Sequence, residues 1–251
     1  MSQNGDTIMP GELPEPLVPL LSPHLARQRW YAGDASASPS LRIVESGRLG
    51  GFDDFPCQML WAIVRAEGAE YQLLIGERAD LEARGHVSGE EAMIGTFDGR
   101  TYYDATADAE MALWLLSAAS GGLESAKIAR PVRVEQSNTS LVYDDRLILK
   151  VFRRVHPGPN PEAEVTTALV AAGFEHVALP FARWQHHGRD LAFGQQYLAG
   201  GTDGWALALT SLRDFYATPA TEGLADPALS GGDFAAEATR LGLVTAEMHL
   251  C

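Results

Sequence analysis

The sequence has little cysteine and little positive charge. Its 251 residues contain two cysteines, Cys57 and Cys251, so a scaffold held together by disulfides is not expected. Lys and Arg number 19 against 33 Asp and Glu, which gives a formal charge of −14. A surface of this sign repels nucleic acid and anionic lipid, so proteins that bind either through surface charge are disfavoured.

Signals for a membrane or a metal are also missing. No window reaches the roughly 18 continuous apolar residues of a membrane span, and residues 1–15 lack the basic and apolar regions of a signal peptide, so we expect a cytoplasmic protein. There is no CxxC pair and no pair of histidines at i,i+4 spacing, so no metal site is expected. The adjacent His186 and His187 are interpreted as solvated residues of a turn.

What is present is typical of a globular α+β protein. Hydrophobic residues make up 46% and charged residues 21%, and the length suits two domains. After a short helix at 17–30, aliphatic runs at 41–45, 58–65 and 70–75 predict a small antiparallel sheet, the core of a β-rich N-terminal domain at 1–95. Met111, Leu115 and Ala118 recur at helical spacing and predict a helical connector at 96–125.

A second domain is predicted at 126–201. Strands at 129–135, 141–143 and 146–153, then a helix, then strands at 177–184 and 191–198 predict an antiparallel five-stranded sheet with one helix. Asn160 followed by Pro161 is a typical helix start, and Gly173 ends the helix. Val165 and Leu169 lie on its expected apolar face.

The last segment, 202–251, is predicted to be helical, with one helix at 202–216 and another that Asp233 could cap and that runs to Cys251. The final helix has apolar positions at Leu241 and Met248 and no stop signal, so we expect the start of a helical C-lobe that is truncated.

Lys150 is the first candidate functional residue. Alternation along 146–153 places it on the same strand face as Ile148 and Phe152, among apolar neighbours. A lysine at the edge of a half-exposed sheet is one interpretation. A strand that ends in aliphatic–aliphatic–Lys before a helix with a glutamate is, however, the layout of a kinase N-lobe, where the lysine meets phosphate and the glutamate orients the lysine.

Two carboxylates compete for that orienting role, Glu162 and Glu164, both in the first turn of the predicted helix. Glu164 is preferred because it borders the expected apolar face. The polar stretch before the second strand offers hydroxyls, an amide and backbone N–H groups that could cover phosphate oxygens, although such a stretch is also an ordinary turn. Its residues are Gln136, Ser137, Asn138, Thr139 and Ser140.

Five stretches together resemble the bacterial maltokinase family. They are the residues 28–33 (QRWYAG), 135–140 (EQSNTS), 146–154 (RLILKVFRR), 157–161 (PGPNP) with Glu164, and 202–205 (TDGW). The resemblance implies a cap domain joined to a lobe like that of aminoglycoside and protein kinases. It also implies ATP-dependent phosphorylation of maltose to maltose 1-phosphate, on a route from trehalose to glycogen or another α-glucan.

The resemblance also implies site residues. Lys150 would bind phosphate, Glu164 would hold Lys150, the stretch from Gln136 to Ser140 would cover ATP, and a hinge from Gln196 to Leu198 would meet adenine. A catalytic loop of His-Gly-Asp type and an acidic Mg²⁺ ligand do not appear after Thr202, so no catalytic residue or metal ligand is expected in this chain, which alone should be nearly inactive.

The run from His187 to Gly194 (HGRDLAFG) imitates the kinase motifs His-Arg-Asp and Asp-Phe-Gly. It is rejected because it falls in a predicted hairpin before the hinge, and Asp190 is interpreted as a turn residue. Two alternatives to a maltokinase stay open. One is a non-catalytic nucleotide-binding or regulatory module that docks on another enzyme, and the other is a kinase for a different sugar such as glucosamine.

Overall fold

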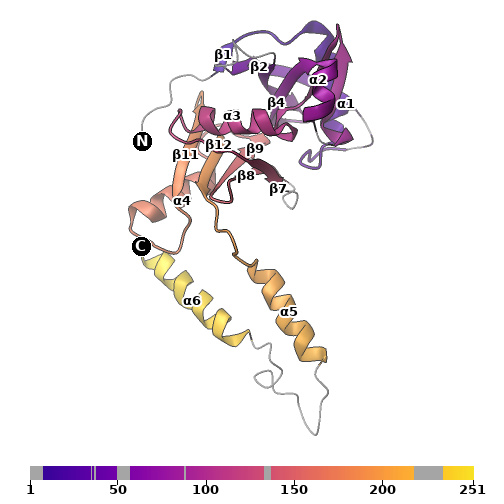
Figure 1. Ribbon diagram of the computed structural model, residues 1–251. Helices are drawn as coiled ribbons and strands as arrows, with labels where there is room; N and C mark the ends of the chain where they lie inside the picture. Colours follow the sequence, from indigo (N-terminus) through magenta and orange to yellow (C-terminus); the bar gives the residue numbers. More distant parts are fainter. Residues whose placement is uncertain are drawn as a thin grey trace. The chain divides into compact units, whose positions relative to one another are not determined.

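The computed structural model (Figure 1) describes residues 8–34, 36, 38–49, 57–87, 89–132, 137–217 and 234–251. The chain divides into two compact units, which are described separately. One consists of Met1–Glu164 with Leu179–Tyr197, and the other of Val165–Ala178 with Leu198–Cys251. Helices and antiparallel strands are both present, so the predicted α+β class is confirmed. In the described part of the chain, no helix combines the length and the apolar character needed to cross a bilayer.

The first unit contains a seven-stranded antiparallel sheet in the order β1-β2-β3-β4-β6-β5, with β10 paired to β4. Its strands are β1 (Ile8–Pro10), β2 (Leu41–Leu49), β3 (Gln58–Ala66), β4 (Ala69–Ala79), β5 (Met93–Phe97), β6 (Arg100–Asp104) and β10 (Arg154–Val155). Short helices accompany them: η1 (Glu15–Leu17), α1 (Val18–Ala26), α2 (Asp80–His86), η2 (Glu90–Ala92) and η3 (Ala105–Ala107).

Residues 59–64 of β3 are all apolar because both faces of the strand are covered here. Met59, Trp61 and Ile63 belong to a core cluster that includes side chains of α3 (Ala109–Ala119), whereas the alternate residues Leu60 and Val64 belong to a cluster with side chains of α1. Successive side chains of a strand point to opposite faces, so a strand covered on both sides reads as a continuous hydrophobic run.

The sheet continues past the predicted end of the cap at residue 95. Asp98 and Gly99 both have positive φ and close a β5–β6 hairpin, so strands and not a helix occupy residues 96–104. The predicted helix around Met111 is confirmed as α3, and Asp108 caps it by accepting hydrogen bonds from the N–H groups of Glu110 and Met111. Within the expected connector, the α-helix is α3, which covers Met111, Leu115 and Ala118, the residues that recur at helical spacing.

The second sheet has five antiparallel strands, as predicted, and their order in the sheet is β11-β12-β9-β8-β7. Its strands are β7 (Ala129–Val132), β8 (Asn138–Tyr143), β9 (Leu147–Phe152), β11 (Pro180–His186) and β12 (Arg189–Gln196), and α4 (Pro161–Ala171) lies between β10 and β11 in the chain. Helix α3 packs between the two sheets, and one hydrophobic cluster contains residues of both (Figure 1). The cap and the second sheet are thus parts of one compact unit.

The second unit contains α5 (Gly204–Ala217) and α6 (Ala235–Leu250), which confirms the two helices predicted in this segment. Neither helix has a buried residue, and several large apolar side chains on them are exposed. These are Trp205, Leu207, Leu209, Leu212, Tyr216, Leu241, Leu243 and Leu250.

Candidate functional site

Lys150 lies on the central strand of the second sheet. Its neighbours in register are Ser140 of β8 and Phe193 of β12, both fully buried. Residues paired across antiparallel strands share a face, so Lys150 emerges from the same face as Ser140. The lysine side chain is 19% exposed, which places its ammonium group at the border between the sheet and solvent.

The carboxylate that holds Lys150 is Glu162, and the preference for Glu164 was wrong. Lys150 Nζ donates to Glu162 Oε1 at 2.5 Å. The predicted apolar face of the helix was also wrong, because Ala163 is fully buried whereas Val165 is 54% exposed. The helix is therefore rotated from the expected orientation, which leaves Glu164 exposed, where its charge contributes to a raised pKa of Arg183.

The first turn of α4 is held in place by the second sheet. Asn160 Oδ1 accepts from the Glu162 N–H at 3.0 Å, as a capping residue does. The Asn160 N–H in turn donates to Asp190 Oδ2 at 2.5 Å, and Asp190 receives two hydrogen bonds from Arg183, at 2.8 and 2.9 Å. Glu162 is thus connected through the backbone of Asn160 to a carboxylate on β12.

Asp190 is not the turn residue that the sequence suggested. It is the second residue of β12, its side chain is 1% exposed, and the turn is made by His187 and Gly188, both with positive φ. The hydrogen bond with Asp190 raises the pKa of Arg183. The rejection of the run from His187 to Gly194 as a catalytic loop agrees with its place in the β11–β12 hairpin.

The polar stretch expected to cover a nucleotide is only partly a loop. Gln136 lies outside the described residues, Ser137 is an exposed bend, and Asn138, Thr139 and Ser140 are the first residues of β8. Thr139 faces the cap, where its Oγ1 accepts from Arg153 Nε at 2.8 Å. A contact between this stretch and a nucleotide remains a prediction, best placed at Ser137.

The expected hinge coincides with the boundary between the two units, which falls between Tyr197 and Leu198. The Gln196 N–H donates to the Leu179 carbonyl at 2.8 Å and the Tyr197 N–H to the Arg146 carbonyl at 2.8 Å. An adenine contact in this segment would therefore use carbonyl oxygens or Leu198.

A buried ion pair that the sequence pattern missed joins the cap to the second sheet. Arg153 Nη2 donates to Asp104 Oδ2 at 2.6 Å and to Thr106 Oγ1 at 2.9 Å. Burial would raise the pKa of Asp104, but the charge of Arg153 and the hydrogen bonds from Arg153 and Thr106 outweigh it and leave this pKa below its usual range. Asp104 and Arg153 are 49 residues apart in the sequence, so no periodic pattern of residues links them. Only the tertiary structure shows that they form a pair.

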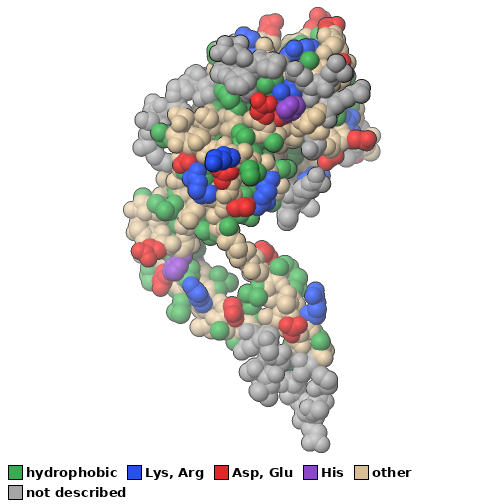
Figure 2. Space-filling view, viewed as in Figure 1, with side chains coloured by type: hydrophobic (Ala, Val, Ile, Leu, Met, Phe, Trp, Pro, Cys, Tyr) green, Lys and Arg blue, Asp and Glu red, His purple; other side chains and the backbone are tan. Residues whose placement is uncertain are grey.

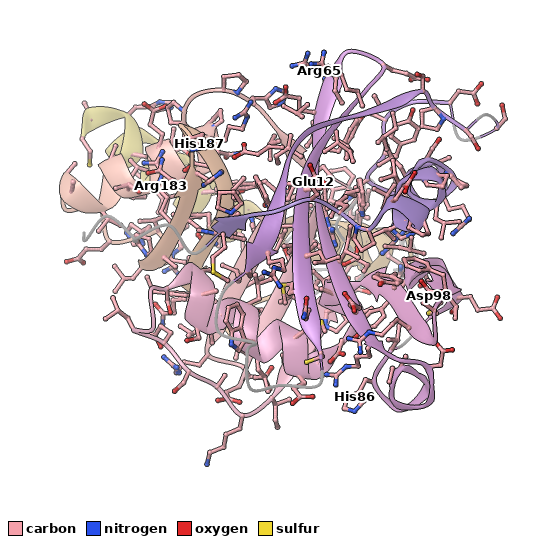
Figure 3. All side chains as sticks on the ribbon, turned by 90° about the horizontal axis from the view of Figure 1, so that it is seen from above. Glu12, Arg65, His86, Asp98, Arg183 and His187 are labelled. Atoms are coloured by element: carbon pink, nitrogen blue, oxygen red, sulfur yellow. The ribbon has the colours of Figure 1, made fainter. Side chains whose placement is uncertain are left out.

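His186 and His187 are not simply solvated. His186 Nε2 lies 2.7 Å and His187 Nδ1 2.9 Å from the same oxygen of Glu45 on β2. Figure 3 labels His187 and Arg183, which lie on the β11–β12 hairpin. The three groups are of metal-ligating types, and the hydrogen bond of His186 and the ion-pair contact of His187 with the carboxylate account for their approach.

Comparison with known proteins identifies the first sheet. Residues 24–108 match the family described as the maltokinase N-terminal cap domain. The match runs from α1 to the N-cap of α3 and so includes the β5–β6 hairpin and Asp104. The cap defined in this way extends past the boundary expected from the sequence.

Two relatives cover more of the chain. A glucosamine kinase of Mycolicibacterium smegmatis is 31% identical over 140 residues, which are 54% of this chain and 32% of that protein. The structure of a glucosamine kinase in crystal form B aligns with a TM-score of 0.50 at 18% identity, over 84% of this chain and 45% of that one, which shows a shared fold. The chain thus spans less than half the length of these relatives. Residues 24–108 are thus similar to the maltokinase N-terminal cap domain, and a longer stretch of the chain is similar to glucosamine kinase.

Proposed function

We propose that this chain is the nucleotide-binding portion of an ATP-dependent sugar kinase. The observation that carries the proposal is the Lys150–Glu162 ion pair on the central strand of the second sheet. A lysine held by a helix carboxylate at the face of such a sheet is the arrangement by which kinases bind nucleotide phosphates. The cap match and the glucosamine kinase relatives support a sugar as the phosphate acceptor.

These residues would act by positioning the phosphates of ATP and by supplying positive charge to them. Lys150 Nζ would pair with a phosphate oxygen of ATP, and Glu162 would keep the ammonium group aimed at it. Mg²⁺, when bound, would neutralise charge that develops during phosphoryl transfer. The carboxylate nearest Lys150 is committed to the lysine, so we assign no Mg²⁺ ligand among the described residues. The cap match favours maltose as the sugar, and the name of the relatives favours glucosamine.

The test uses the low lysine content of the chain, which contains only Lys127 and Lys150. An acyl-phosphate derivative of ATP acylates a lysine amine that lies beside the bound phosphates. We expect mass spectrometry to find the label on Lys150 and not on the exposed Lys127, and unmodified ATP in excess to prevent it. Equal labelling of both lysines, unaffected by ATP, would contradict the proposal.

A thermal-shift measurement gives an independent answer. ATP with Mg²⁺ should raise the melting temperature of the parent chain, because a ligand that binds only the folded state stabilises it. Lys150→Met should abolish the shift and Lys127→Met should retain it. Formation of maltose 1-phosphate or glucosamine phosphate is then assayed in a longer chain that includes a catalytic loop.

A further inference from the structure

A cavity of about 770 Å³ lies between the cap and the second sheet, inside the first unit. Its size is in the range of roughly 300–1,000 Å³ that small-molecule sites occupy. Small apolar side chains, among them Ala109, Ala112 and Ala129, form part of its wall, together with Trp30. The proposed ATP site does not account for this cavity.

Part of the cavity wall lies on the face of the second sheet opposite Lys150. Thr139 and Leu141 line it, and their partners in register are Val151 and Leu149. Because paired residues share a face and successive residues alternate, all four point away from the face of Lys150 and Ser140. The lining residues Arg130, Val132 and Asn138 belong by register to the other face. A ligand seated against Thr139 and Leu141 would be separated from the phosphates of ATP by the sheet.

The charge of the cavity wall is opposite to that of the whole protein. Four arginines line it, Arg27, Arg29, Arg130 and Arg153, against two carboxylates, Asp104 and Glu91. The formal charge of the chain is −14, so this excess of arginine is a local concentration of positive charge. Figure 2 shows basic and acidic side chains close together over the second sheet, and Figure 3 labels His86, another lining residue, on α2.

The bonding of Arg27 and Arg153 leaves capacity for an anion, whereas Arg130 is already paired with Asp145 at 2.7 Å. Arg27 Nη2 donates to a neutral acceptor, the Met93 carbonyl oxygen, at 3.1 Å. Arg153 is neutralised by Asp104, but its Nη1 has no hydrogen-bond partner in the described part of the structure. Guanidinium groups bind phosphate through paired, charge-assisted hydrogen bonds, and the three oxygens of a phosphate monoester can accept from several of them at once.

We propose that this cavity is a second ligand site, which binds a small phosphorylated molecule such as a sugar phosphate between the cap and the back of the second sheet. Its phosphate group pairs with the arginines, and its body lies against the apolar part of the wall. The inference does not depend on the proposed kinase activity, because it rests on a different face of the sheet and on different residues.

Calorimetric titration of the full chain tests the site with glucose 1-phosphate, inorganic phosphate, malonate and uncharged glucose as probes. We expect the phosphate ester to bind and glucose not to bind. Arg27→Gln should weaken binding by about tenfold, the effect of losing one charge-assisted hydrogen bond. Arg42→Gln removes the same charge from an exposed position of β2 outside the cavity and should leave the affinity unchanged.

Lys150→Met separates this site from the proposed ATP site. Binding of the phosphate ester should persist in this variant and in the presence of saturating ATP. Loss of binding in Lys150→Met would place the ligand on the other face of the sheet and overturn the proposal. Three other results would also overturn the proposal: no binding of the phosphate ester to the parent chain, binding of malonate but not of the ester, or a loss of affinity in Arg42→Gln equal to that in Arg27→Gln.

Discussion

The ion pair between Lys150 and Glu162 is the residue-scale feature on which the proposed function depends. The side chain of Lys150 is 19% exposed and that of Glu162 is 34% exposed, so the pair is only partly buried. An exposed pair of this kind adds little to stability. Its value lies in keeping the ammonium group in one orientation before a phosphate arrives.

Glu162→Gln tests that role. The amide can still accept a hydrogen bond but no longer holds the lysine by charge, so we expect affinity for ATP to fall by about three- to tenfold, with little change in melting temperature. Glu164→Gln is the matched control, two residues away on the same helix, and should bind ATP like the parent. Titration calorimetry measures the affinity of the parent and both variants for ATP. An equal loss of affinity in the two variants would refute the assignment of Glu162.

His24 makes the stability of the cap depend on pH. Its side chain is buried, and burial, reinforced by the charges of Arg153 and Arg27 and opposed by that of Asp104, lowers its pKa from 6.5 to about 4. As the pH falls from 6.5 to 4, the unfolded chain takes up a proton at this imidazole and the folded chain does not. The free energy of unfolding therefore decreases in this window, by up to about 3 kcal/mol.

Urea unfolding at several pH values between 7 and 4 measures this loss. His24→Gln should reduce the slope of stability against pH below 6.5, the unshifted value for this histidine. Replacement of the exposed His249 by Gln should leave the slope as it is. The lowered pKa of Asp104 acts in the same direction at lower pH, so the variant is expected to keep part of the acid sensitivity.

At the scale of elements, the start of α4 connects the sheet to the candidate site. Asp190 on β12 holds the Asn160 N–H, and Asn160 caps the turn that carries Glu162. A cap of this type stabilises a helix by about 1 kcal/mol. Because the cap is itself anchored to β12, the position of Glu162 relative to Lys150 is set by the sheet and not by the helix alone.

Asn160→Ala should lower the free energy of unfolding by about 1 kcal/mol and also weaken ATP binding, since the first turn of α4 loses its cap. Asp145→Asn changes a side chain that is 65% exposed in the β8–β9 turn and should alter stability by less than about 0.5 kcal/mol. Chemical denaturation and calorimetry check the two effects. A stability loss in Asn160→Ala without any change in ATP affinity would show that the cap does not position Glu162.

At the scale of the whole first unit, the side chain of Gln72 is one of the buried links between the two sheets. Gln72 on β4 is fully buried, donates from Nε2 to the carbonyl oxygens of Phe152 and Leu191, and accepts from the Trp61 indole. With β10 paired to β4 and a shared hydrophobic cluster, these bonds make the cap and the second sheet one cooperative structure.

Gln72→Leu leaves two buried carbonyls and one indole N–H without their partner. Each unsatisfied group costs about 1–3 kcal/mol, so we expect a loss of about 3 kcal/mol or more. Cap and second sheet should still unfold in one transition, observed through Trp61 in the cap and Trp184 on β11. Gln185→Leu, at an exposed position of β11, is the control and should be nearly neutral. Two separate transitions in the parent protein would contradict the shared core.

By itself, the sequence determined most elements of the second sheet and the position of Lys150 on it. Apolar periodicity and turn residues predicted five strands and a helix in the second domain, and alternation placed Lys150 on a sheet face among apolar residues, because these signals are local. Contacts between distant residues were decided by tertiary structure alone. The orientation of α4 places Glu162, and not Glu164, beside Lys150. The turn at His187 places two histidines next to Glu45. Packing of the cap on the second sheet forms the Arg153–Asp104 pair and the arginine-lined cavity. The physical reason is that side-chain convergence depends on how elements pack, and no spacing within one element encodes that packing.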